Sequence, residues 1–243
     1  QRDPEAFEKC RYLTGSAKQQ EIDKILAKAG LDDKRIQGMT LKEVFPGYST
    51  YVDDAALMEY KKAGLTHVWA GVDNADSVVA ICKSDGFTAT NYRITAGMKK
   101  CGASPGADMK SGGADNVFTR LGCKVDMDYQ MSFLGEDYRV IISPEVMNRT
   151  DWYAHRGDSY GVAKLNDSRW KKRLGTTDFI KSETGSKYDF TCDNEILFRH
   201  GIGTDQFVGI SCQDERRRQV LLEKFRDAGV TEFNGIPIDE FVT

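Results

Sequence analysis

Short apolar segments recur through the last two thirds of the chain, and they limit the possible folds more than any other feature. They are rich in the β-branched and aromatic residues that are enriched in strands. We expect strands at residues 65–71, 116–121, 139–143, 195–198 and 206–211. Helical patterns precede and separate these segments, so the sequence predicts an α+β fold.

Helical spacing dominates the front of the chain. Apolar residues recur at that spacing from Ala17 to Ala29, and shorter helices are expected at residues 40–45 and at Val52–Ala63. Acidic residues begin the third of these helices and lysines end it, as the helix dipole favours. We therefore expect a helical N-terminal extension, residues 1–63, ahead of a strand-rich body, residues 64–243.

Two further helices are expected within the body. One covers Asp76–Lys83 and ends before Gly86, and the other covers Asp214–Ala228. The buried side of the second helix is predicted to carry Val220, Leu221, Leu222 and Phe225. Residues 90–113 are rich in Gly, Ser and Lys, which predicts a long loop, and loops of that length are usually functional or mobile.

Composition excludes several classes of protein. The 243 residues are 40% hydrophobic and 29% charged, as in ordinary globular proteins, and the net charge of −3 argues against a globally basic nucleic-acid coat. No stretch approaches the roughly 18 apolar residues of a membrane span, and the first residues lack a signal-peptide pattern. None of the six cysteines forms a C-x-x-C pair, so we expect no metal site and favour free thiols over disulfides.

Two patterns early in the body could bind a ligand. In Thr66–Gly71, a histidine on a strand beside a glycine offers a ring hydrogen bond and an open backbone edge. Equally, His67 could be an ordinary core histidine at the start of a strand. Arg93, at the head of the Gly-rich loop, could clamp a phosphate bidentately or could be a solvated loop residue.

Two further patterns lie later in the chain. Gly112 and Gly113 enter the apolar strand that begins at Asn116, where the backbone could approach a ligand closely, although a bulge or tight turn would give the same pattern. Glu195 opens another apolar strand. A carboxylate that is partly desolvated there could accept a hydrogen bond from a sugar hydroxyl. The alternative is a strand-edge carboxylate that faces water.

Taken in order, these four patterns resemble the ADP-ribosyltransferase superfamily and, within it, the DNA-targeting toxins of the DarT kind. The shared features are a histidine on the first strand, a helix ending in glycine, an Arg-bearing loop, and a late glutamate that opens an apolar strand. The resemblance covers residues 65–230. It implies an ADP-ribosyltransferase-like split mixed β-sheet preceded by the helical extension.

The resemblance also implies an enzyme that takes NAD⁺ as its substrate and transfers ADP-ribose to a macromolecular acceptor, either protein or nucleic acid. Glu195 would stabilise the positive charge that develops on the ribose, and Arg93 would hold the pyrophosphate or position the acceptor. His67, Gly71 and Asn74 would bind the dinucleotide. The aromatic residue that stacks on nicotinamide would be one of Phe118, Tyr153 and Tyr160.

Two other functions stay open on this sequence. An RNA 2′-phosphotransferase on the same fold would need arginines and histidines around a phosphate, for which Arg93, Arg120, His67 and His200 are candidates. A non-catalytic module of a phage or secretion system is the second. A dehydrogenase is excluded, because Gly201-Ile202-Gly203 lacks the third glycine and the following helix of a dinucleotide-binding motif.

The acceptor and the place of action are less constrained. Basic clusters at 169–173 and 216–218 could contact nucleic acid, or could be ordinary solvated charge. A role as a bacterial toxin or effector would fit either a cytoplasmic protein or a secreted protein that is delivered into a target cell.

Overall fold

The computed structural model describes residues 54–62, 64–84, 86–89, 116–123, 136–149, 152–156 and 194–243. The helices predicted at residues 17–29 and 40–45 and the predicted Gly-rich loop at 90–113 lie outside these residues. The third predicted helix is confirmed as α4 (Asp54–Lys62). Gly64, which follows it, has a positive φ of 104°, and its N–H bonds to the carbonyl of Lys61.

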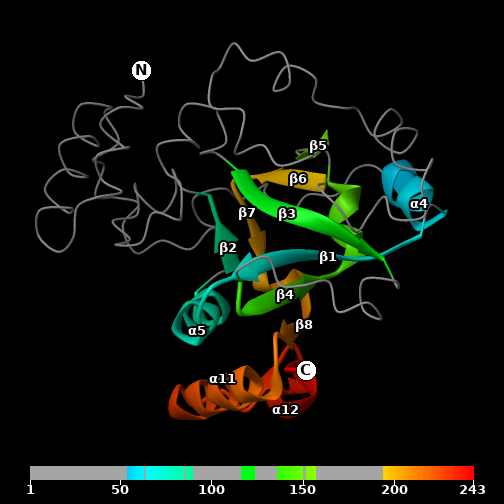
Figure 1. Ribbon diagram of the computed structural model, residues 1–243. Coiled ribbons are helices and arrows are strands. Elements are labelled where there is room, and N and C mark those ends of the chain that lie inside the picture. The colour runs from blue at the N-terminus through cyan, green and yellow to red at the C-terminus, as the bar shows by residue number, and fades with distance from the viewer. Residues whose placement is uncertain are drawn as a thin grey trace, which may run out of the picture.

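Six strands form the central sheet (Figure 1). Their order is β5-β6-β3-β1-β4-β8, so counting along the chain they lie fourth, fifth, second, first, third and sixth. All neighbouring pairs are antiparallel, and the only parallel pairing in the described residues is an isolated bridge between Ile210 and Val242. The expectation of a mixed sheet is therefore wrong for this sheet. The strands are β1 (Leu65–Val72), β3 (Asn116–Cys123), β4 (Tyr138–Ile142), β5 (Trp152–Arg156), β6 (Asn194–Arg199) and β8 (Phe207–Cys212).

The main hydrophobic core unites the sheet with its helices. β1 contributes Val68, Ala70 and Val72, which are spaced by two residues and therefore share one face of the sheet. Side chains from α4, α5 (Ala75–Lys83) and α11 (Glu215–Asp227) belong to the same core. Because Leu57 and Tyr60 of α4 are buried in it, the end of the predicted helical extension packs with the body.

Helices α5 and α11 begin at side chains that cap them. The Asn74 side-chain oxygen accepts a hydrogen bond from the Ser77 N–H at 2.9 Å, and the Asp214 carboxylate accepts one from the Arg217 N–H at 2.8 Å. Along α11, Leu221, Leu222 and Phe225 are buried, but Val220 is 40% exposed. Its predicted burial is wrong, because successive helical residues differ by about 100° in direction and only one arc of α11 contacts the core.

Two short ribbons complete the described fold. β2 (Gly86–Thr88) pairs with β7 (Gly201–Gly203), and β9 (Glu232–Phe233) pairs with β10 (Ile236–Pro237). Asn234 and Gly235 join the second pair with φ of 52° and 78°, the backbone that a two-residue hairpin turn of this kind requires. The remaining elements are η3 (Pro144–Asn148), η5 (Thr204–Gln206) and α12 (Ile238–Phe241).

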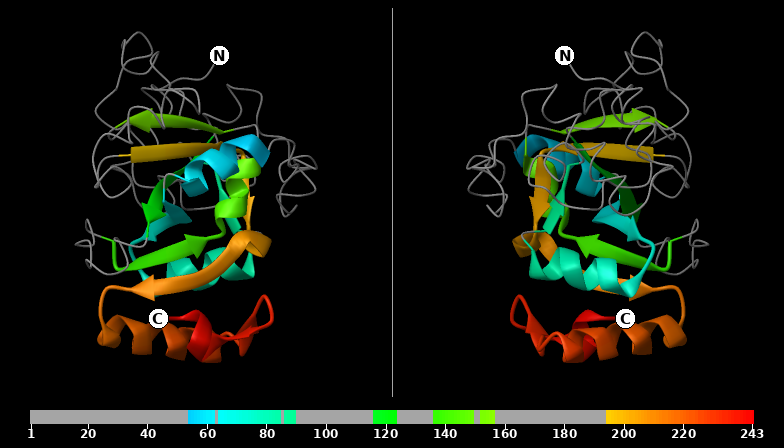
Figure 2. Two further views of the ribbon diagram at one scale, coloured as in Figure 1. Left: turned by 90° about the vertical axis from the view of Figure 1, so that its right-hand side faces the viewer. Right: turned by 90° about the vertical axis from the view of Figure 1, so that its left-hand side faces the viewer.

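The two ends of the described part differ in content. β5 and β6 lie at one end, whereas α11 and α12 lie at the other, beyond β8 (Figures 1 and 2). Thr243 follows the outer edge of β8, where its N–H bonds to the Ile210 carbonyl and its carbonyl accepts from the Cys212 N–H. None of the helices in the described ranges has the length and apolar character needed to cross a bilayer.

Candidate functional site

The face of the central sheet opposite the main core carries polar and aromatic side chains. Alternate residues of a strand point to the same face, and cross-strand partners share a face. Trp69 of β1 is the partner of both Arg120 on β3 and Ile141 on β4, and Phe118 is the partner of Leu197 on β6. We call this surface the polar face. Its described members include His67, Trp69, Gly71, Phe118, Arg120, Gly122, Arg139, Ile141, Glu195 and Leu197.

His67 is buried on the polar face, with 7% of its surface exposed. Its cross-strand partner is Gly122, and a Cβ built on that glycine would overlap the imidazole ring. The ring therefore lies over the backbone of β3 where any larger residue would exclude it. Its Nδ1 is 2.8 Å from Oγ1 of Thr66, and the Thr66 hydroxyl also donates to the Gly122 carbonyl at 3.4 Å.

The imidazole of His67 is uncharged near neutral pH. Burial and, after it, the positive charge of Arg139 lower the pKa of His67 from 6.5 to about 4. When the Thr66 hydroxyl donates to the Gly122 carbonyl, it accepts from an Nδ1–H of His67, and Nε2 is then a hydrogen-bond acceptor. A neutral ring of this kind can bind a hydroxyl group without adding charge.

Trp69 lies at the centre of the polar face and contacts two guanidinium groups. The Arg139 guanidinium carbon is 4.2 Å from the centre of its ring, and that of Arg120 is 5.9 Å away. Arg139 also forms an ion pair with Glu136 at 3.0 Å, in which both side chains are about nine-tenths buried. Glu136 in turn lies beside Gly71, since a Cβ there would be 3.1 Å from its Cγ.

Glu195 is a buried carboxylate on β6, with 8% of its surface exposed. It does not face open water, so the alternative of a solvated strand-edge residue is wrong. Its cross-strand partner on β5 is His155, and the next residue on the same face is Leu197, which is fully buried. β3 alone separates β6 from β1, so Glu195 and His67 share the polar face with a single strand between them.

The remaining predicted residues fall into three groups. Gly71 and Phe118 lie on the polar face with His67 and Glu195. Asn74 lies beyond the end of β1 and its side-chain oxygen caps α5, so the structure gives it a local structural contact. Tyr153 lies in β5 as the partner of Leu197. Arg93 and Tyr160 are outside the described residues.

Sequence reasoning did not assign Trp69, Arg139 or Glu136 to the site. Trp69 could have been found from the strand pattern, because it stands between His67 and Gly71 at the two-residue spacing of one sheet face. Arg139 and Glu136 lie near the start of β4, and their approach to Trp69 and Gly71 depends on the register between β1 and β4. That register is not visible in the local sequence.

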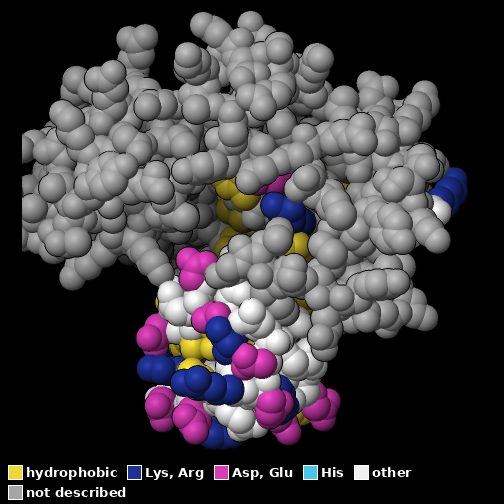
Figure 3. Space-filling model, in the orientation of Figure 1, with side chains coloured by type: hydrophobic (Ala, Val, Ile, Leu, Met, Phe, Trp, Pro, Cys, Tyr) yellow, Lys and Arg dark blue, Asp and Glu magenta, His cyan; other side chains and the backbone are white. Residues whose placement is uncertain are grey.

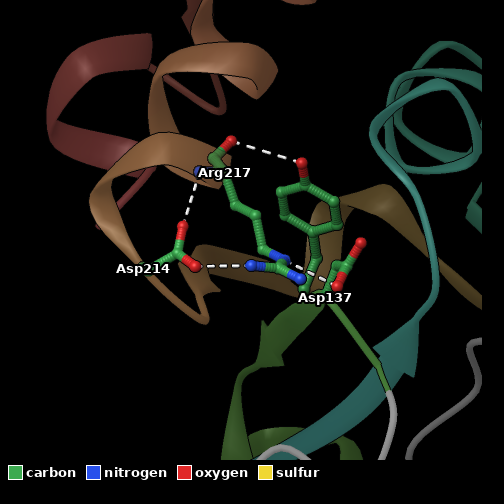
Figure 4. Close-up of polar contacts among 4 residues, drawn as sticks. Asp137, Asp214 and Arg217 are labelled. Carbon is green, nitrogen blue, oxygen red and sulfur yellow. Dashed lines mark hydrogen bonds and ion pairs between the residues drawn. The ribbon is translucent and has the colours of Figure 1, made fainter.

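The basic cluster at 216–218 has a structural role (Figure 4). Arg217 at the start of α11 bonds to Asp137, ahead of β4, at 2.6 Å and also to Asp214. Arg218 donates to the carbonyls of Val242 and Asp239, each at 2.8 Å. Because Arg217 ties α11 to Asp137 and Arg218 ties α11 to the C-terminal residues, this cluster gives little support to a nucleic-acid surface.

Figure 3 shows described apolar, basic and acidic side chains close together over the part of the sheet where β1, β3 and β6 lie in Figure 1.

Comparison of the chain with protein families and with characterised proteins, and of its fold with solved structures, found no match. The chemistry of the polar face is therefore the basis for assigning a function.

Proposed function

We propose that this chain is an NAD⁺-dependent ADP-ribosyltransferase whose substrate binds on the polar face. The observation that carries the proposal is that a buried carboxylate, Glu195, and a buried neutral imidazole, His67, lie on one face of the sheet with a single strand between them. Burial strengthens the electrostatic effect of a carboxylate, because the surroundings screen it less than water does. Such a group suits a reaction in which positive charge develops.

In the proposed reaction, the bond between the nicotinamide nitrogen and ribose C1′ breaks and its electron pair leaves with nicotinamide. Positive charge develops on the ribose ring, and the Glu195 carboxylate stabilises that charge more than it stabilises the ground state. A nucleophile of the acceptor then bonds to C1′ and releases its proton. With water as the acceptor, the products are ADP-ribose, nicotinamide and a proton.

The low pKa of His67 suits the same reaction. An imidazolium beside the ribose would oppose the developing positive charge, whereas the neutral ring does not. Its Nε2 can accept a hydrogen bond from a ribose hydroxyl when Nδ1 carries the proton. His67 therefore acts as a substrate-orienting group, and Gly71 lies on the same strand and face, beside the Glu136 side chain.

The residues of the polar face match the parts of NAD⁺ by type. A carboxylate and a neutral imidazole suit the ribose hydroxyls, arginines suit the diphosphate, and the aromatic ring of Phe118 suits a flat nicotinamide. Phe118 is partly exposed on this face, two residues along β3 from Arg120, the cross-strand partner of Trp69. The acceptor is proposed only as a macromolecule, protein or nucleic acid.

The proposal is tested by nicotinamide release from NAD⁺, with and without a cell lysate as a source of acceptors. We expect Glu195→Gln to lower the rate by on the order of 10²–10³-fold, since it removes one preorganised charge while keeping the side-chain shape. Glu223→Gln, at an exposed position on α11, is the matched control and should keep full activity. Equal rates for wild type and Glu195→Gln, with both folded, would reject the assignment.

One observation favours a second candidate, an RNA 2′-phosphotransferase that also consumes NAD⁺. Arg120 and His67 share the polar face, as that reaction would require of residues that bind a phosphate. The product separates the two candidates. A 2′-phosphorylated RNA would yield ADP-ribose cyclic phosphate in the second case, whereas ADP-ribose attached to the acceptor indicates the first.

A further inference from the structure

The two arginines of the polar face differ in their partners. Arg139 is buried, forms its ion pair with Glu136 at 3.0 Å and contacts the Trp69 ring at 4.2 Å. Its charge is balanced and its position is fixed on two sides. Arg139 is therefore a poor candidate to bind a new anion, because a ligand would have to compete with a buried carboxylate.

Arg120 has no carboxylate within ion-pair distance among the residues that the structure describes. Its described contact is with the Trp69 ring, 5.9 Å from the ring centre. The side chain is partly buried, so its positive charge is only partly hydrated. A guanidinium that rests on an aromatic ring keeps its N–H groups available at its edges, which is the geometry that binds phosphate oxygens.

The position of Arg120 relates it to the ribose-binding residues. β3 lies between β1 and β6, and Arg120 is the cross-strand partner of Trp69, two residues from His67 along β1. Glu195 stands on the other side of β3, one residue before Ile196, which pairs with Thr119. A ligand whose ribose contacts Glu195 and His67 therefore places its neighbouring groups over β3.

We propose that Arg120 binds the diphosphate of the dinucleotide substrate and that Trp69 positions its guanidinium for that contact. The inference rests on the proposed function, and it assigns to β3 the phosphate contact that the sequence assigned to Arg93. The diphosphate is the anionic part of NAD⁺, so it is the part that an arginine with no carboxylate partner among the described residues would select. Glu195 then stabilises the positive charge that develops on the ribose, whereas Arg120 binds the negative charge of the diphosphate.

The test is calorimetric titration of ADP-ribose into wild type, Arg120→Gln, Arg120→Lys and Arg226→Gln at low and at high salt. ADP-ribose carries the diphosphate and both riboses but cannot react further by loss of nicotinamide. Arg120→Gln should bind it roughly 10- to 100-fold more weakly at low salt, as expected for losing charged hydrogen bonds, and should show a smaller salt dependence. Arg120→Lys should have an intermediate affinity for ADP-ribose, because lysine keeps the positive charge but lacks the planar guanidinium that bonds to two oxygens at once.

Arg226→Gln, at an exposed position on α11, should bind as wild type does. If wild type binds ADP-ribose and Arg120→Gln binds it equally well with the same salt dependence, the diphosphate assignment is wrong and the proposed function stands. If wild type binds no ADP-ribose at all, both are wrong. Thermal unfolding of each variant shows that a weakened affinity is measured on folded protein.

Discussion

His67 owes its place in the structure to the residue opposite it. Gly122 has no side chain, so the imidazole ring lies over the backbone of β3, where Thr66 provides a hydrogen-bonding partner for Nδ1. The same burial that packs the ring also removes its positive charge. The space around the His67 ring and the charge of the ring can therefore be tested separately.

The prediction about space concerns Gly122→Ala. The added methyl group would overlap the His67 ring, so the ring must move, and overpacking of this kind costs about 1–3 kcal/mol in the free energy of unfolding. Urea denaturation measures the loss, and ADP-ribose affinity should fall with it. Gly209→Ala is the matched control on β8, because its Cβ would meet only the Phe241 carbonyl at an ordinary 3.5 Å. Equal stability of the two variants would contradict the position of the ring.

The prediction about charge concerns pH. The pKa of His67 is about 4 when folded and 6.5 as the ordinary value, so the unfolded chain binds more protons between these pH values. Neutral His67 therefore stabilises the fold fully above pH 6.5, and this contribution is lost as the pH falls toward 4. The free energy of unfolding should drop by about 3 kcal/mol more in wild type than in His67→Gln over that range.

Urea denaturation of both proteins at pH 7, 6, 5 and 4 gives this difference directly. The comparison between the two proteins cancels the carboxylates that titrate in the same range. A difference that does not change with pH would mean that His67 is protonated in the folded protein at about the same pH as in the unfolded chain.

At the scale of elements, α5 shows why Asn74 was a plausible ligand-binding residue and what it does in the structure. It follows the strand that carries His67, but its side-chain oxygen accepts the Ser77 N–H at the start of the helix. α5 packs against the core through Ala75, Val78 and Cys82. Weakening its N-terminal cap should therefore lower the stability of the whole fold.

Asn74→Ala should therefore lower the free energy of unfolding by about 1 kcal/mol, whereas Asn74→Ser, which keeps an acceptor, should lose little. Denaturation measures both. ADP-ribose affinity should be unchanged in the two variants. A large loss of affinity in Asn74→Ala without a loss of stability would instead make Asn74 a ligand-binding residue.

Elements with a strong local pattern could be predicted from the sequence, and elements made by pairing could not. The helical spacing of α11 and the apolar runs of β1 and β6 are visible in the chain itself. β7 has only three residues, two of them glycines, and is a strand because it pairs with β2. β5 has the short sequence Trp-Tyr-Ala-His-Arg, without apolar alternation along its length, and it pairs with β6 in register.

The candidate site divides in the same way. His67 and Glu195 were recognisable because each is a polar residue in an apolar strand. Their position on one face follows from the strand order and from the two registers with β3. The partners of β1 and β6 on β3, Gly122 and Phe118, are separated by an even number of residues and so point to the same face. A single sequence displays neither the order nor the registers. The pairing of Arg139 with Glu136, and the contact of Trp69 with two arginines, follow from the same long-range register.

At the scale of the whole molecule, the central sheet separates two environments. One face packs apolar side chains against helices, and the other holds the buried ionisable groups that we assign to substrate binding. Two of the three tryptophans report on this division. Trp69 lies on the polar face, whereas Trp152 contacts Tyr60 of α4, and its indole N–H bonds to the Met147 carbonyl of η3.

Binding of NAD⁺ to the polar face is tested by an NMR titration of the indole N–H signals with NAD⁺, each signal assigned by a Trp→Phe variant. If the polar face binds the dinucleotide, the signal of Trp69 shifts in a saturable way and that of Trp152 does not. The Arg120→Gln variant should show the same shift only at higher concentrations of NAD⁺. Binding of NAD⁺ that leaves Trp69 unchanged, or that shifts Trp152 instead, would contradict the account.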